Sequence, residues 1–149
     1  MVGLSLKQAN KIRVKVLGLI RNQNQIFVCE GYDSVKQQTY YRALGGSIDF
    51  GEDSLSALQR EFQEEIQAEL TNIKYLGCVE SIFTFEARQS HEILQVYSCD
   101  FADSKFYQVK ELFFTELSAD TPIKALWTDI SSFKSGKLKL VPEGFCDFI

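Results

Sequence analysis

The feature that most constrains the fold is a glycine pair that precedes an acidic, amphipathic segment. Gly45 and Gly46 follow a stretch rich in aromatic and apolar residues at 39–44, and residues 55–66 carry apolar side chains at helical spacing. Glycine lets a backbone take positive φ and approach another group closely. The order therefore predicts a strand, a glycine turn and then a helix from about Leu55 to Ile66.

The predicted helix has two distinct faces. At about 100° per residue, one apolar stripe should face a sheet, and it contains Leu55, Leu58, Phe62 and Ile66. Either Asp53 or Ser54 suits the N-cap. A second face lies roughly 110° away and carries Glu61, Glu64 and Glu65. These like charges repel one another, so this face is either a solvated acidic surface or a site where a cation binds to hard oxygen donors.

Length and composition fit one globular domain, which we predict for residues 1–149. The net charge is −4 and the 16 Lys and Arg residues are scattered, so we expect neither a nucleic-acid duplex nor a membrane surface as a partner. No apolar stretch approaches about 20 residues, and the first residues lack a signal-peptide core. The four cysteines form no CxxC pair and stand among apolar residues. We therefore expect a cytoplasmic protein with free, mostly buried thiols.

Alternating and β-branched patterns predict a sheet around this helix. The patterned stretches are 12–20, 26–29, 39–44, 74–85, 93–101 and 123–127. Residues 106–115 are ambiguous, and residues 130–134 resemble a helical turn that ends at Gly136. The pattern predicts a mixed sheet with one prominent helix and a second near the C-terminus, an α/β or α+β fold.

The spacing of the acidic residues resembles the Nudix box, G-x5-E-x7-R-E-U-x-E-E-x-G-U, in which U is a bulky apolar residue. The positions in register are Gly46, Glu52, Arg60, Glu61, Glu64 and Glu65, with Phe62 at the first U. The resemblance covers Gly46 to Ala68 and extends to the preceding strands, the Trp127 region and the length. It implies the Nudix fold of a MutT-like protein, a mixed β-sheet sandwiched between helices.

The resemblance also implies a role for each matching residue. The implied ligands of Mg²⁺ or Mn²⁺ are Glu61, Glu64, Glu65 and the carbonyl group of Gly45. Arg60 would orient the glutamates and pair with Glu52. One carboxylate, either Glu61 or a glutamate from a later loop, would activate water. The residues implied in catalysis are therefore Glu61, Glu64, Arg60 and Glu52.

Three positions depart from the family pattern. Gln67 replaces the glycine that would end the helix in a left-handed conformation, and Ala68 replaces a bulky apolar residue. Gln67 then either adopts that conformation at a cost of about 1 kcal/mol, or the helix continues further. Leu44 replaces a proline that many members place before the glycine pair. None of the three changes removes an implied metal ligand.

The resemblance implies a magnesium-dependent diphosphohydrolase, a pyrophosphatase that cleaves a nucleoside diphosphate linked to another group by attack of metal-activated water on phosphorus. One alternative is a catalytically silent Nudix-fold module that binds nucleotides or regulates a partner, although the intact carboxylates argue against it. Another is an acidic cation-binding protein without catalysis, although an EF-hand pattern is absent.

Several residues outside the box are candidates for substrate contacts. Tyr40, Tyr41 and Arg42 precede the glycine pair on a strand that leads to the site. Alternation lets one tyrosine face the core while its neighbour faces the ligand, with Tyr41 as the candidate, and Arg42 suits a phosphate. Glu92 would reach the metals from across the site, with Glu111 and Glu116 as rivals. The expected partner is a small-molecule nucleoside diphosphate derivative, for example a nucleotide or a nucleotide sugar. The sequence does not discriminate among these compounds. Homodimers are common among similar proteins, so a homodimer stays open.

Overall fold

The structure is a computed structural model that describes residues 10–116 and 121–149. In chain order, its elements are β1 (Ile12–Leu19), β2 (Arg21–Asn22), β3 (Gln25–Asp33), β4 (Gln38–Ser47), α2 (Ser54–Ile66), β5 (Leu70–Phe85), β6 (Arg88–Phe101), the 3-10 helix η1 (Ser104–Tyr107), β7 (Glu111–Phe114), β8 (Ile123–Asp129), α3 (Ile130–Lys134) and the 3-10 helix η2 (Glu143–Phe148). This mixture of strands and few helices confirms the predicted α+β class. The ambiguous stretch at 106–115 contains the end of η1 and all of β7.

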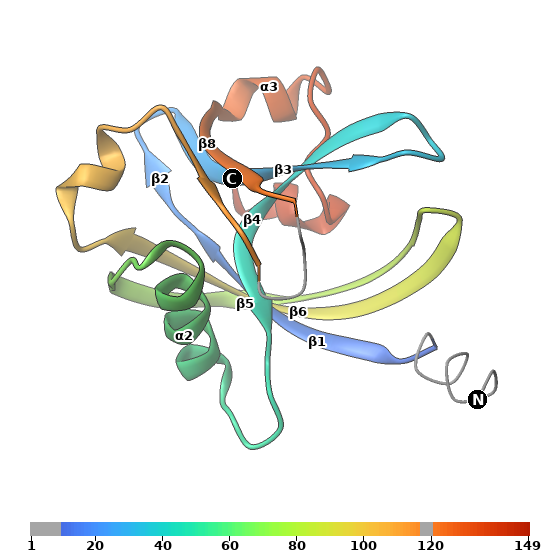
Figure 1. The fold of residues 1–149 in the computed structure, drawn as a ribbon, viewed down its shortest axis with the longest axis horizontal. Helices are drawn as coiled ribbons and strands as arrows, with labels where there is room; N and C mark the ends of the chain where they lie inside the picture. The colour runs from blue at the N-terminus through green and yellow to red at the C-terminus, as the bar shows by residue number, and fades with distance from the viewer. Residues whose placement is uncertain (1–9, 117–120) are drawn as a thin grey trace.

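The strands form one mixed sheet that opens into two branches. Its order is β5-β6-β1-β4-β3-β8-β7, with β2 paired to β3. Only β1 and β6 run parallel among the paired strands of the described residues. β4 belongs to both branches, because residues 44–47 pair with β1 whereas residues 38–43 pair with β3. The β3–β4 hairpin and the long β5–β6 hairpin therefore separate where they leave the shared strands β1 and β4 (Figure 1), although their tips are in contact.

Helices cover both faces of the sheet and create two cores. Phe62 of α2 packs with Val16 and Trp127 in one core. Leu17 lies in the other core with Phe133 of α3 and Phe145 of η2. Neighbouring residues of β1 thus point to opposite faces, as strand geometry requires. The arrangement confirms the predicted sheet between helices (Figure 1).

Helix α2 matches the predicted segment but buries a slightly different stripe. The Asp53 side chain caps it by accepting a hydrogen bond from the Ser56 backbone N–H at 2.8 Å. Leu55 was expected in the buried stripe, and this expectation is wrong because Leu55 is 42% exposed. The first turn instead packs through Ala57 and through Ser54, whose hydroxyl hydrogen bonds the Tyr97 hydroxyl at 2.6 Å. Since Leu55 lies about 100° from Ser54, it turns toward solvent.

The helix ends where the family pattern places glycine. Gln67 adopts the left-handed conformation, with φ 52° and ψ 43°. Its N–H donates to the Gln63 carbonyl at 3.1 Å, and the Ala68 N–H donates to the Phe62 carbonyl at 3.2 Å. These bonds satisfy carbonyl groups at the helix end. Of the two sequence alternatives, the strained cap is therefore correct and the helix does not continue.

The four cysteines are free, but their burial is less uniform than expected. Cys99 is buried, Cys29 and Cys146 are half-buried, and Cys78 is exposed. The expectation is wrong for Cys78 because β5 is the edge strand of the sheet and nothing in the described residues covers that position. No helix in the described part of the chain is long and apolar enough to cross a membrane.

Candidate active site

The glycine pair lies within β4, next to β1 and α2. Among the described glycines only Gly51, Gly77 and Gly136 have positive φ, so the pair forms no turn and does not use the positive φ that glycine allows. The pair is instead required for close packing. A methyl group on Gly46 would lie 2.5 Å from Glu61 Oε1, inside any ordinary contact. The strand thus forms a cradle that only glycine leaves open for the Glu61 carboxyl group.

Arg60 organises the acidic end of α2. Its Nε and Nη2 donate to the two carboxylate oxygens of Glu52 at 2.7 and 2.8 Å, a bidentate ion pair. Its Nη1 donates to Glu61 Oε1 at 3.1 Å and to Glu64 Oε2 at 3.2 Å. Nη2 also donates to the Ser47 carbonyl at 2.9 Å. Arg60 therefore pairs with Glu52 as expected and fixes the helix against the end of β4.

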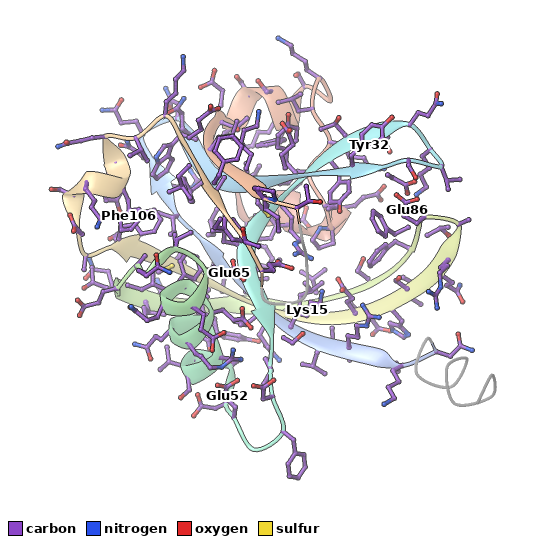
Figure 2. The ribbon with its side chains drawn as sticks, in the orientation of Figure 1. Lys15, Tyr32, Glu52, Glu65, Glu86 and Phe106 are labelled. Carbon is purple, nitrogen blue, oxygen red and sulfur yellow. The ribbon has the colours of Figure 1, made fainter. Side chains whose placement is uncertain are left out.

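The pKa values of two glutamates at the site are shifted in opposite directions, by different causes. The hydrogen bonds from Arg60 lower the pKa of Glu52 to about 2. Burial raises the pKa of Glu65, and a hydrogen bond and charge from Glu61 raise it further, with a smaller effect from Glu116. Figure 2 shows Glu52 beside the start of α2 and Glu65 near its end. The site thus combines a strongly ionised carboxylate just before the helix, Glu52, with a crowded carboxylate near the helix end, Glu65, that favours a proton or a cation.

The carboxylates of Glu61, Glu64 and Glu65 are oxygen donors of the kind that bind divalent cations, but in this structure they do not converge on one position. Within residues 10–116 and 121–149, no three His, Cys, Asp or Glu side chains are arranged to hold a metal ion. Arg60 draws Glu61 and Glu64 toward itself. The oxygen donors, the glycine cradle and the raised pKa of Glu65 nevertheless suit Mg²⁺ or Mn²⁺. Gly45 lies in the β1–β4 ladder opposite Leu17.

A cleft of about 600 Å³ lies between the two branches of the sheet. The side chains that matter most for its chemistry are Arg13, Lys15, Tyr40, Arg42, Phe85 and Glu92. The segment from Lys139 to Gly144 closes another side of it. The cleft is therefore bounded by charged and aromatic groups from both branches.

Arg42 lies between the cleft and the acidic helix. It lines the cleft, and its charge also acts on Glu65. Burial alone would lower the pKa of Arg42, but Cys29 and Glu92 raise it. In the described part of the chain its Nε is buried without a hydrogen-bond partner. A buried guanidinium with an unused donor is suited to an incoming anion.

Of the other two candidates for substrate contacts, Glu92 lines the cleft and Tyr41 does not. Glu92 lines the cleft and pairs with Lys15 at 2.9 Å, whereas the later glutamate that influences Glu65 is Glu116. Tyr41 lies in the opposite core, where its hydroxyl donates to Glu30 at 3.0 Å. It does not line the cleft. The neighbouring Tyr40 does.

Sequence reasoning missed Lys15 as a candidate for the site. Its signal is a cation flanked by two valines, Val14 and Val16, within a predicted strand. Glu116 was named only as a rival, because nothing in its local pattern indicates proximity to α2. Phe83 and Phe85 also line the cleft. Trp127 is a core residue, and its indole N–H donates to the Phe106 carbonyl at 2.9 Å.

Comparisons with known proteins agree with this geometry. A family model described as the NUDIX domain matches residues 10–135. No curated protein matches the chain. A MutT NUDIX hydrolase from Burkholderia pseudomallei has a TM-score of 0.59 at 18% identity, over 82% of this chain and 86% of its own. A NUDIX hydrolase from Nitrosomonas europaea gives 0.59 at 16% identity, over 93% and 87%. A MutT protein from Bacillus halodurans gives 0.61 at 15% identity, over 92% and 79%.

Proposed function

The chain belongs to the NUDIX family, and we propose that it is a Mg²⁺- or Mn²⁺-dependent diphosphohydrolase acting on a nucleoside diphosphate derivative. The observation that carries the proposal is the Arg60 network, which holds Glu52, Glu61 and Glu64 together beside the glycine cradle. A solvated acidic face would not need a guanidinium that bridges three carboxylates, or a glycine opposite one carboxyl group. Arg42 supplies a cation on the side of the cleft.

The proposed ligands of the cation are Glu61, Glu64, Glu65 and the carbonyl group of Gly45. The raised pKa of Glu65 supports this assignment, because its carboxyl group is crowded by Glu61 and a cation would relieve that repulsion. Arg60 positions Glu61 and Glu64, and Glu52 in turn holds Arg60. Glu52 and Arg60 are therefore positioning residues in this proposal.

The proposed reaction is hydrolysis of a phosphoric anhydride. When bound, Mg²⁺ or Mn²⁺ neutralises phosphate oxygens and lowers the pKa of a water molecule. Glu61 or Glu116 accepts a proton from water as the water oxygen bonds to phosphorus. The bridging P–O bond breaks, and the leaving phosphate group keeps its electron pair. Arg42 binds oxygens of the diphosphate through the donor that is buried without a partner in the described residues.

Hydrolysis of a compound panel tests the proposal. The panel contains nucleoside triphosphates, dinucleoside polyphosphates, ADP-ribose and nucleotide sugars, each with Mg²⁺ and with excess EDTA. We expect at least one compound to be cleaved at a diphosphate linkage with Mg²⁺ and none with EDTA. Binding of a compound without cleavage would indicate the silent module instead, and cleavage that persists in EDTA would contradict the metal assignment.

A further inference from the structure

The two hairpins that bound the cleft are tied together at their tips. The Ser34 backbone N–H donates to Glu86 Oε1 at 2.8 Å, and its hydroxyl donates to the other carboxylate oxygen. Lys36 Nζ donates to the Thr84 carbonyl at 2.6 Å, and the Glu86 N–H donates to the buried Asp33 at 3.2 Å. Figure 2 places Glu86 at the tip of the β5–β6 hairpin. We name these contacts the hairpin clasp; they hold the two walls at a fixed separation.

The cleft gains aromatic side chains toward the clasp, where Asp33 and Lys36 also line it. On one wall, Ser81 pairs with Glu92, and the strands then continue toward the clasp through Phe83 and Phe85. On the other wall, Arg42 is followed toward the clasp by Tyr40, whose ring packs edge-on against Phe85 at 5.9 Å. We call the end at Arg42, nearest the acidic helix, the polar end, and the end at the clasp the aromatic end.

Glu92 is a buried anion with unused acceptors at the polar end. It is 6% exposed, and its Oε2 receives Lys15 Nζ at 2.9 Å. An ionised carboxylate offers about four acceptor positions, and no other hydrogen bond to Glu92 occurs within residues 10–116 and 121–149. The Glu92 side chain lines the cleft, so donors of a ligand in the cleft can reach these acceptors. Lys15 balances the charge of Glu92, so the remaining acceptors suit hydroxyl donors rather than a second cation.

We propose that the cleft binds the nucleoside of the substrate, with the ribose hydroxyls donating to Glu92 and the base against the aromatic end. Glu92 is then a specificity-determining residue that selects ribonucleosides over their deoxy counterparts. A volume of about 600 Å³ is in the range of small-molecule sites. The order phosphate, ribose, base matches the order Arg42, Glu92, Phe85 along the cleft. This inference rests on the proposed function in one respect, the binding of the substrate phosphates at Arg42.

Calorimetric affinities test the inference without requiring turnover. The probes are ADP, GDP, CDP and UDP with Mg²⁺, each beside its 2′,3′-dideoxy counterpart. We expect at least one ribonucleoside diphosphate to bind at least about tenfold more tightly than its dideoxy form, because a site built for hydroxyl groups rejects analogues that lack them. The Glu92→Gln variant should bind both forms with nearly equal affinity.

Two further variants keep the test decisive. Glu92→Gln leaves Lys15 without its anion, so the double variant Lys15→Gln, Glu92→Gln removes both charges and should show the same loss of selectivity. Glu69→Gln is the control, because Glu69 is an exposed glutamate that does not line the cleft. It should keep the preference.

The outcomes separate this inference from the proposed function. Equal affinity of wild type for both forms, no binding of any probe, or a preference retained in both Glu92 variants overturns the inference. Metal-dependent hydrolysis without ribose preference overturns it and leaves the proposed function intact. Ribose-dependent binding without hydrolysis supports the inference and contradicts the proposed function.

Discussion

Alanine substitutions at the neighbouring Gly45 and Gly46 should affect stability and activity separately. In Gly46→Ala, the new methyl group lies 2.5 Å from Glu61 Oε1, whereas ordinary contact begins at 3.4 Å. The carboxyl group must therefore move by about 1 Å, a displacement that can reduce catalysis about 100-fold. Because the obstructed group is the end of a flexible side chain, we expect the free energy of unfolding to change by less than about 1 kcal/mol.

Gly45→Ala adds the same methyl group one residue earlier and should have the opposite effect. The methyl carbon would lie 2.8 Å from the Val16 carbonyl carbon and closer still to its oxygen. This obstruction is backbone within the β1–β4 ladder, which cannot move without breaking strand pairing. Overpacking of this kind costs about 1–3 kcal/mol and sometimes more, so we expect a loss of about 3 kcal/mol of unfolding free energy.

Three measurements on both variants complete this test. Urea unfolding followed by fluorescence of the buried Trp127 gives stability, Mn²⁺ titration gives metal affinity, and the compound panel gives kcat/KM. We expect Gly46→Ala to lose metal affinity and activity but remain folded, and Gly45→Ala to lose stability. Wild-type metal affinity and activity in Gly46→Ala would refute the assigned cradle. A Gly45→Ala variant as stable as wild type would refute the packing argument.

Other consequences concern pH, the helix end and the phosphate contact. Arg60 lowers the pKa of Glu52 from 4.5 to about 2, so the ion pair stabilises the fold fully above pH 4.5 and this stabilisation is lost as the pH falls toward 2. Glu52→Gln should therefore lower the urea midpoint of unfolding at pH 7 and lower it less at pH 3. An equal decrease at both pH values would contradict the ion pair. Gln67→Gly should stabilise by about 1 kcal/mol by relieving positive φ, whereas Gln63→Gly within the helix should destabilise by about 1 kcal/mol. Arg42→Lys should raise KM for a cleaved compound about tenfold with little change in kcat, since lysine cannot reproduce a bidentate phosphate contact; an unchanged KM would remove Arg42 from the phosphate.

The sequence predicts the acidic helix well because its signals are local. Apolar spacing, a capping aspartate and the box spacing all fall within residues 53–67, and helix α2 spans Ser54–Ile66. The predicted burial of Leu55 and the predicted turn at the glycine pair are wrong because their signals are not local. Their surroundings depend on Tyr97 and on Val16, which are distant in sequence and known only from the fold.

The cleft could not be predicted because it arises where the two hairpins separate. Strand alternation allows either Tyr40 or Tyr41 to face the site, and only the pairing of β4 with both β1 and β3 decides for Tyr40. The placement of Glu116 near Glu65 likewise depends on tertiary structure. The single domain over residues 1–149, the cytoplasmic location, the roles of the box residues and a homodimer stay predictions.

The most direct measurement of the central claim is Mg²⁺-dependent hydrolysis by Glu64→Gln and Glu65→Gln, with Glu69→Gln as a control just beyond the helix. Each change keeps the shape of the side chain but removes its charge, and circular dichroism verifies that each variant is folded. We predict that Glu64→Gln and Glu65→Gln each lower kcat/KM at least about 100-fold, because losing a charge that coordinates the metal should cost more than losing a partner of a metal ligand. Glu69→Gln should keep wild-type activity. Full activity in both folded helix variants would contradict the proposed metal site.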